Sequence, residues 1–324
     1  MPPRRVIGLD AGGTKLLGGV VDETLEVHHR VHRRILGLDQ SQLLDALVDA
    51  VEEARTAAPD ADVVGFGIPA LVRPGTGGVM VSNHLPLDGV PFRDLMSERL
   101  GLPVRVDNDS NVAMLAEHRA GVARGIDDAV LLALGTGIGG GLLIGGRIYQ
   151  GSEGAGAELG HIVVDPDGPD CPGACPGRGC LEAYASGNAL GRAGTEAARA
   201  NPDSALGRVL AAGREVTGGL VTELAHDGDP LAREVIAEAG RWLGIGIVTL
   251  VNIFNPELVI IGGGASAAGD LMLDPAREVL AERGLPPNRQ MVRVVLADFG
   301  SEAGMMGAAL LALDAAATSA GAAT

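Results

Sequence analysis

The sequence predicts an α/β fold with two similar lobes and a cleft between them, and three observations support this prediction. The chain has 324 residues, a length typical of two domains. Apolar residues make up 46% of it, and the mean hydropathy is +0.23, enough for packed cores without disulfides. A strand–glycine turn–strand unit at Val6–Val21 recurs at Ala129–Gly146, which indicates a duplicated architecture with one glycine hairpin per lobe.

The first lobe begins with two apolar runs, Val6–Asp10 and Leu16–Val21, joined by a glycine-rich turn, which is the pattern of paired strands. Leucines and valines at helical spacing then predict an amphipathic helix over Gln40–Ala58. The other elements predicted for this lobe are a strand at Val63–Ile68, a helix at Asp94–Leu100, a strand at Val104–Val106 and a helix from the capping cluster Asp107–Ser110 to about His118.

The second lobe is predicted to begin where glycines and aspartates break the pattern near Ala120–Asp127, which gives lobes of 1–120 and 121–300. Gly151–Cys180 is a long segment without periodicity, a length that suggests function or a metal staple. The predicted elements are strands at Ala129–Leu134, Leu258–Ile261 and Val292–Ala297, a helix at Leu231–Val251, and a last helix from Ser301 to about Ala316, with 301–317 packing back on the first lobe.

The charge balance excludes some classes of protein. Subtracting 41 acidic from 25 basic residues gives a net charge of −16, and the pI is about 4.8. This argues against a nucleic-acid partner and an anionic membrane surface, but not against phosphorylated substrates. The apolar run before Asp10 is too short for a signal peptide, and glycines divide the uncharged Ala129–Gly146 into two strands instead of a membrane helix. We therefore expect a cytoplasmic protein.

The first glycine turn, Asp10–Lys15, holds the only lysine of the chain. Backbone N–H groups beside glycines approach an anion closely, Thr14 adds a hydroxyl donor, and Lys15 adds a charge. Asp10, at the strand end, can hold Mg²⁺ through water. The turn is no Walker A loop, because the lysine follows the threonine and a strand comes next. The alternative is an ordinary glycine hairpin.

The second glycine turn, Gly135–Gly141, contains the spacing GxGxxG of dinucleotide-binding proteins. An apolar strand follows it where that fingerprint requires a helix. A second phosphate loop therefore fits better than the site of a nicotinamide-dependent dehydrogenase, which remains an alternative. A third glycine run, Gly262–Ser266, follows a strand and is either part of a nucleotide site or a close-packed turn.

The cluster Asp107–Asp109 has two compatible interpretations. It is typical of a helix N-cap, and it also places a carboxylate where it could accept the proton of a substrate hydroxyl. We expect the helix dipole to keep that carboxylate ionised.

An odd number of cysteines, clustered in the loop, favours a metal over disulfides. Three cysteines and one histidine fit tetrahedral zinc, and four protein ligands make the zinc structural. The ligands would be His161, Cys171, Cys175 and Cys180. The metal would order the loop and present Glu158, Glu182 and the second nitrogen of His161 to a polyol. The alternative is a set of reduced thiols.

These motifs, in this order, resemble the ROK family of repressors, open reading frames and kinases, and within it the bacterial glucokinases, especially the actinobacterial ones. The resemblance covers Asp10 to about Gly307 and is most specific at DAGGTK, NDSN, LGTGIGGG, and ELGH followed by the cysteines and GCLE. It implies a ribonuclease H-like, duplicated actin-like fold and ATP-dependent phosphorylation of the glucose 6-hydroxyl in glycolysis. It also implies Mg²⁺, structural zinc and a homo-oligomer, either dimer or tetramer.

By this resemblance Asp109 matches the catalytic base, and Asn83 matches an asparagine near the sugar. The positions that match sugar-binding residues are Asn83, Asn108, Asp109, Glu158, His161 and Glu182. Those assigned to the nucleotide, its phosphates and Mg²⁺ are Asp10, Gly12, Gly13, Thr14, Lys15, Thr136, Gly137, Gly263 and Gly264.

The chain departs from the family pattern at three places. Gly173 stands where the first zinc cysteine usually falls, so Cys171 must substitute for it. Ala70 replaces a glycine, and the tryptophan usual after Asn83 is absent. Another hexose, an N-acetyl amino sugar and polyphosphate as donor therefore remain alternatives. A sugar-responsive repressor would need a DNA-binding module, but only five residues precede Val6, and the net charge is negative.

Overall fold

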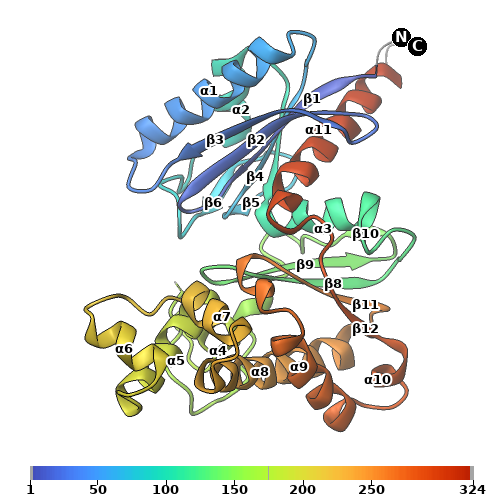
Figure 1. Ribbon diagram of the computed structural model, residues 1–324. Helices are drawn as coiled ribbons and strands as arrows, with labels where there is room; N and C mark the ends of the chain where they lie inside the picture. Colours follow the sequence, from blue (N-terminus) through green and yellow to red (C-terminus); the bar gives the residue numbers. More distant parts are fainter. Residues whose placement is uncertain (1–2, 174, 322–324) are drawn as a thin grey trace. The chain divides into compact units, whose positions relative to one another are not determined.

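The structure is a computed structural model that describes residues 3–173 and 175–321, and these fold into two compact units (Figure 1). The first unit takes the described residues up to Gly125, the segment Ile148–Ala157 and those from Ser301 onward. The second unit takes Ile126–Arg147 and Glu158–Gly300.

A five-stranded mixed sheet forms the centre of the first unit. Its order is β3-β2-β1-β4-β7, in which β1 pairs antiparallel with β2 and parallel with β4. The strands are β1 (Arg5–Ala11), β2 (Lys15–Asp22), β3 (Val27–Arg34), β4 (Val64–Ile68) and β7 (Val104–Asn108), and a separate pair is formed by β5 (Leu71–Val72) and β6 (Val79–Val81). The parallel strands end at one edge of the sheet, and Asp10 and Asn108 lie near these ends.

Four helices belong to the first unit: α1 (Gln40–Ala57), α2 (Phe92–Leu100), α3 (Asp109–Ala120) and α11 (Ala303–Gly321). A capping box between Asp39 and Gln42 begins α1, which buries its apolar face toward β2 and β3. The last helix, α11, packs on β1 and β4 (Figure 1). Contact is so close that a Cβ on Gly65 would lie 1.8 Å from the carbonyl oxygen of Ala308, so only glycine fits there. The sequence predicts that this helix starts at Ser301. In the structure a short 3₁₀ turn, Gly300–Glu302, comes first, and the helix starts at Ala303.

The second unit repeats the sheet of the first. Its order, β10-β9-β8-β11-β12, has the same arrangement of a meander of three strands followed by two parallel strands. The strands are β8 (Ala129–Leu134), β9 (Ile138–Ile144), β10 (Arg147–Ile148), β11 (Leu258–Gly262) and β12 (Arg293–Leu296). The internal repeat predicted from the sequence is therefore confirmed.

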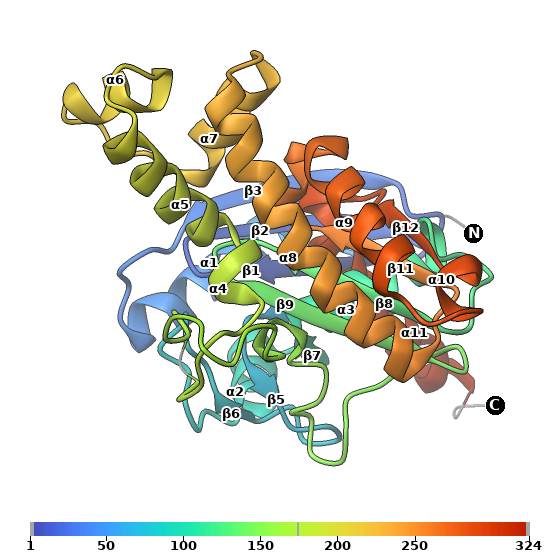
Figure 2. The ribbon, with the colours of Figure 1, turned by 90° about the horizontal axis from the view of Figure 1, so that it is seen from below.

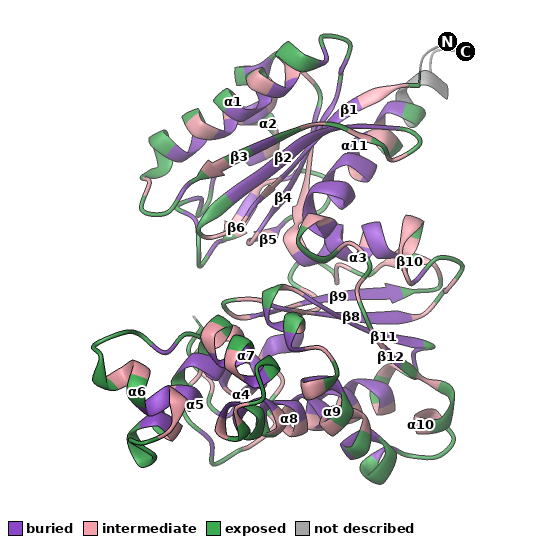
Figure 3. Ribbon diagram, in the orientation of Figure 1, coloured by how far each residue is buried: buried purple, intermediate pink, exposed green. Residues whose placement is uncertain are grey.

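Helices α8 and α9 lie on one face of the second sheet (Figures 1 and 2). The second-unit helices are α4 (Glu182–Ala185), α5 (Gly187–Ala200), α6 (Ala205–Ala211), α7 (Gly218–His226), α8 (Pro230–Phe254), α9 (Asp270–Arg283) and α10 (Asn288–Met291). By length and composition α8 could cross a membrane, but core helices of soluble proteins pass the same test, and half of its most apolar window is buried in the protein. In Figure 3 the buried residues follow the strands and the helix faces turned toward them.

The structure differs from the sequence-based division in two segments, of which the shorter, 121–125, extends the first unit to Gly125. Residues 148–157 pack with the first unit, whereas the sequence analysis assigned them to the second lobe. Gln150 Nε2 donates to Asp107 Oδ2 at 2.7 Å, and Gly154 lies against the carbonyl oxygen of Val72. These contacts join residues far apart in the sequence, so no local pattern could reveal them.

Candidate active site

The first glycine loop connects β1 to β2 as a tight turn. The backbone N–H of Gly12 donates to the carbonyl oxygen of Lys15 at 3.0 Å, and β2 begins at Lys15. A strand follows the loop, as the sequence predicts. The side chain of Lys15 is exposed and lies opposite Arg34 of β3 in the register of the sheet. The loop therefore presents backbone N–H groups, the hydroxyl of Thr14 and two cationic residues.

The start of α3 shows which member of the cluster Asp107–Asp109 serves the fold. Asn108 is the N-cap, and its Oδ1 accepts hydrogen bonds from the N–H groups of Ser110 and Asn111 at 2.9 and 3.2 Å. Its Nδ2 donates to the carbonyl oxygen of Ala70 at 3.3 Å. The helix-cap interpretation is thus correct for Asn108. The side chain of its neighbour Asp109 does not cap the helix and can serve as the proton acceptor.

Asp109 is held by one neighbour. The N–H and hydroxyl of Ser110 donate to Oδ1 of Asp109 at 2.7 and 3.2 Å, so Oδ2 is the oxygen available to a ligand. Burial raises the pKa of the Asp109 carboxyl, while the hydrogen bonds from Ser110 and the charge of His84 lower it. Burial, the largest effect on this pKa, thus opposes the helix dipole, which we expect to favour the ionised form. A raised pKa suits a general base, which must take up a proton.

A second carboxyl group lies near Asp109. Burial, followed by the negative charge of Asp109, raises the pKa of Asp10 to about 7, and Lys15 lowers it. A Cβ on Gly304 of α11 would lie 2.4 Å from the carboxyl carbon of Asp10, so the last helix covers this group closely. A buried carboxyl group whose pKa is raised further by a neighbouring carboxylate lies in an environment in which a cation is stabilising.

Asn83 lies in the loop between β6 and α2, where its side chain is exposed. The next residue, His84, was not singled out by the sequence analysis. A Cβ on Gly13 would lie 3.2 Å from Cβ of His84, so His84 packs against the first glycine loop. The structure thus brings Asp10 near Asp109 and Lys15 near Asp10, and it adds His84 beside Asp109.

The second glycine loop connects β8 to β9. The N–H of Gly135 donates to the carbonyl oxygen of Gly137 at 2.9 Å, and Thr136 is exposed at the tip. Because β9 follows, the strand–turn–helix context of a dinucleotide fingerprint is absent from this described segment. Gly263, at φ +80°, packs against the end of β8, and Gly264 has open space beside it. The second and third glycine runs therefore lie together in the second unit.

Glu182 links the second glycine loop to the cysteine segment. Its side chain is 8% exposed, and Oε2 accepts a hydrogen bond from the N–H of Ile138 at 2.7 Å. Its other oxygen, Oε1, faces Gly173. Glu158 is exposed, and its Oε2 lies 3.9 Å from Nε2 of His161. Both carboxylates predicted to meet a polyol therefore lie beside the His161 and cysteine group.

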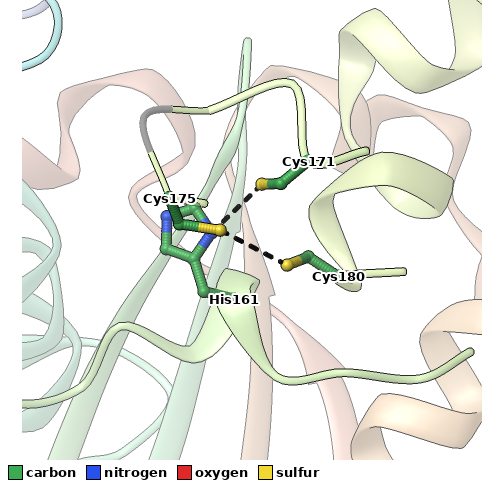
Figure 4. A group of neighbouring side chains, drawn as sticks. All are labelled: His161, Cys171, Cys175 and Cys180. Carbon is green, nitrogen blue, oxygen red and sulfur yellow. Dashed lines mark hydrogen bonds between the residues drawn. The ribbon is translucent and has the colours of Figure 1, made fainter. Parts of the chain in front are cut away.

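The four predicted metal ligands come together in the second unit (Figure 4). One donor atom of each of His161, Cys171, Cys175 and Cys180 lies within 4.8 Å of the others, and none of the cysteines is in a disulfide. Nδ1 of His161 lies 3.4 Å from Sγ of Cys171, and the sulfurs of Cys175 and Cys180 are 3.6 Å apart. Nδ1 therefore faces the sulfurs, whereas Nε2 faces Glu158.

The structure shows how Cys171 reaches this group. A Cβ on Gly173 would lie 2.8 Å from Oε1 of Glu182, 3.0 Å from Cε1 of His161 and 3.6 Å from Sγ of Cys171. A cysteine at position 173 would thus direct its side chain into the space that Cys171 Sγ already approaches. The loop places Cys171 through the hydrogen bond of its N–H to the carbonyl oxygen of Gly177, at 2.9 Å.

Comparison with known proteins identifies the family. The family model described as ROK family matches residues 6–315. The chain belongs to the ROK family. It is 37% identical over 311 residues to a glucokinase of Streptomyces coelicolor, covering 94% of this chain and 96% of that protein. It is 34% identical to a glucokinase of Thermotoga maritima, covering 95% of this chain and 97% of that protein.

A solved ROK structure has the same fold. The crystal structure of a ROK family glucokinase from Streptomyces griseus in complex with glucose and AMPPNP has a TM-score of 0.87 and 36% identity, and the match covers 96% of this chain and 99% of that chain. The predicted ROK membership and two-lobed ROK kinase fold are thereby confirmed. Within this ROK protein, sequence reasoning missed His84 and Gln150, and the only available signal for His84 was the altered sequence after Asn83.

Proposed function

We propose that this ROK protein is a glucokinase that transfers the γ-phosphoryl group of ATP to the 6-hydroxyl of glucose. The observation that supports this most directly is Asp109, a carboxyl with raised pKa and one available oxygen, near a glycine loop that carries the only lysine. Phosphoryl transfer needs mainly positioning and charge stabilisation, which these groups supply. The likeness to glucokinases over nearly the whole chain supports the same activity.

In this mechanism Oδ2 of Asp109 accepts the proton of the sugar 6-hydroxyl as that oxygen attacks phosphorus. The bond from phosphorus to the oxygen of ADP breaks, and ADP leaves. Lys15, Thr14 and the N–H group of Gly13 bind phosphate oxygens. Gly12, whose own N–H is held by the carbonyl oxygen of Lys15, has no side chain to keep the phosphates away from the loop. The paired carboxyls fit Mg²⁺, which Asp10 would hold and which would neutralise phosphate charge when bound.

We assign the second unit to the sugar hydroxyls, the nucleotide and zinc. Glu158, His161 and Glu182 would bind hydroxyl groups, together with Asn83 and Asn108 of the first unit. Thr136, Gly137, Gly263 and Gly264 would bind nucleotide. Three thiols and one imidazole nitrogen within 4.8 Å of one another fit a tetrahedral zinc ion, which would stabilise the loop.

Two alternatives within the kinases follow from the departures near Asn83: another hexose or an N-acetyl amino sugar as acceptor. Polyphosphate is the alternative donor. We further propose a cytoplasmic homo-oligomer, dimer or tetramer, that acts in glycolysis.

One experiment tests the activity and both alternatives. Purified protein is assayed for phosphorylated sugar and ADP over a panel of hexoses and N-acetyl hexosamines, with ATP and polyphosphate compared as donors. We expect the highest kcat/KM with glucose and ATP. Turnover of another sugar in preference to glucose would change the substrate, and no transfer to any sugar would overturn the proposal. Light scattering of the same sample gives the oligomeric state.

A further inference from the structure

His84 occupies a fixed place in the first unit because the loop around it is anchored. Ser82 is buried, its N–H donates to Oδ1 of Asp88 at 2.6 Å, and its hydroxyl donates to the carbonyl oxygen of Pro69 at 3.2 Å. The side chains of Leu85 and Leu87, which follow His84 in the loop, are buried. His84 itself is exposed, and its ring makes no hydrogen bond to any residue that the structure describes. The loop thus holds an imidazole whose nitrogens are available to a ligand.

The side chain of His84 lies against the anion-binding loop. A Cβ on Gly13 would be 3.2 Å from Cβ of His84, 3.6 Å from Cγ and 3.9 Å from Nδ1. Gly13 belongs to the loop whose N–H groups are assigned to phosphate, so the imidazole adjoins that loop. At position 13 only glycine leaves the contact between the loop and the side chain of His84 undisturbed.

The same imidazole is near the proposed base. Its charge lowers the pKa of the Asp109 carboxyl, opposing burial. Asp109 accepts the proton from the sugar hydroxyl in the proposed mechanism, and the glycine loop binds the phosphates. A group near both lies where the transferred phosphoryl group passes from donor to acceptor.

We propose that His84 is a further catalytic residue, whose ring N–H donates a hydrogen bond to an oxygen of the phosphoryl group during transfer. This inference rests on the proposed kinase function. His84 gives up no proton in the step: the hydroxyl proton goes to Asp109, the new bond forms between the sugar oxygen and phosphorus, and the bond to ADP breaks. Donors aimed at oxygens that gain charge typically contribute about 10²–10³ in rate when placed in a dry site. Because His84 is exposed, we expect a smaller factor of about 10–100.

The test compares three variants with wild type. His84→Ala should lower kcat by about 10–100-fold, with the KM for glucose changed less than about threefold, because the ring contacts the phosphoryl group and not the sugar. His84→Gln keeps a neutral N–H donor and should retain more activity than His84→Ala. His84→Arg supplies N–H donors at the same position and should also exceed His84→Ala in kcat. Thermal unfolding should match wild type for all three, because the side chain is exposed.

His32→Gln is the matched control, because His32 is an exposed histidine of the same unit on β3, outside the assigned machinery. It should behave as wild type. A wild-type enzyme that phosphorylates a sugar while His84→Ala keeps more than half of its kcat would overturn the inference and leave the kinase function intact. An equal loss in all three His84 variants would also overturn it, since a steric effect would then explain the result. Absence of sugar phosphorylation by wild type would instead refute the proposed function, and the inference with it.

Discussion

Asp109 and Asn108 are adjacent and both polar, yet the fold uses them differently. Oδ1 of Asn108 caps α3, and its Nδ2 donates to the carbonyl oxygen of Ala70. In Asp109 the bonds from Ser110 use Oδ1, so Oδ2 is available to a ligand. The motif alone predicts that this cluster is a cap, a base or both. Which residue is the cap depends in part on the hydrogen bond from Asn108 to Ala70, which lies 38 positions away in the sequence. A local sequence pattern cannot reveal such a contact.

Replacing Asp109 by Asn should remove the base and preserve the fold. The bonds from Ser110 end on an oxygen that Asn also has, and Asn108 still caps the helix. We expect kcat to fall by about 10²–10⁴, with glucose affinity by calorimetry nearly unchanged. Asp94→Asn, in the first turn of α2, is the control for a change of charge at a helix start. Retention of more than about a tenth of wild-type turnover would contradict the role of base.

The raised pKa of Asp10 predicts a pH-dependent cost in stability. Its usual value is 3.8 and its value in the folded protein is about 7. Between these values the folded chain holds a proton that the unfolded chain has released, so the free energy of unfolding falls as pH rises. The cost is absent below about pH 4 and complete above about pH 7.

Asp10→Asn should remove this cost. In magnesium-free buffer we expect the variant to be more stable than wild type by about 1–3 kcal/mol at about pH 8, with the difference vanishing near pH 4. Denaturant unfolding at several pH values measures it. A difference that is constant with pH would show that Asp10 is not the titrating group. The variant should lose activity, since Asp10 is the proposed Mg²⁺ ligand.

At the scale of elements, the cysteine segment stands apart because it contains little regular secondary structure. Between Gly151 and Cys180 the structure describes one short 3₁₀ turn, Leu159–His161, and isolated bridges such as Val163 with Cys180. Glu182 follows directly and holds the N–H of Ile138 in the second glycine loop. A metal in the segment would therefore fix the carboxylates assigned to the sugar.

Cys180→Ala tests this link. We expect wild type to carry about one zinc per chain by elemental analysis, and the variant to lose it, because three ligands remain. Glucose affinity by calorimetry should fall at least tenfold, whereas affinity for AMPPNP should fall less. Asp167→Ala, an exposed residue of the same loop, is the control. A folded variant that lacks zinc and binds glucose normally would disprove the idea that the metal organises the sugar residues.

Which elements could be predicted depends on how strongly each segment is patterned. Apolar runs bounded by glycine or proline, such as β4 and β8, were predicted within one or two residues. The edge strand β3 was missed because histidine and arginine fill most of its positions and only Val31 is buried. Helix α5 was missed because alanine and glycine dominate it, which leaves few large apolar residues to mark a period. Helices α6 and α7, of seven and nine residues, were missed because they are too short to show one.

At the scale of the whole molecule, the last helix completes the unit that begins the chain. Met305, Ala308, Ala309 and Ala312 of α11 are fully buried. Small residues on both sides allow this contact, in which Gly65 of β4 meets the backbone of Ala308. Without α11 one face of the first sheet would be exposed.

A chain that ends at Gly300 should therefore lose the first unit. We expect low soluble yield, and loss of the thermal transition that this unit contributes, because the apolar face of β1 and β4 has no cover. A chain that ends at Ala317 keeps the buried part of α11 and is the control. A soluble chain ending at Gly300 that melts like the full chain would contradict this account.

The position of α11 also has a consequence for protein synthesis. The ribosome makes the residues of the second unit before it makes α11. During that time one face of the first sheet is not yet covered by this helix. Gly304 covers Asp10, and Gly307 packs against the carbonyl oxygen of Val112 in α3, the helix that starts at Asp109. Asp10 and the helix that carries Asp109 thus acquire their final environment only after α11 has been made and has packed. We therefore expect a chain without α11 to be inactive, and a stop codon before Ala303 to yield no partly active enzyme.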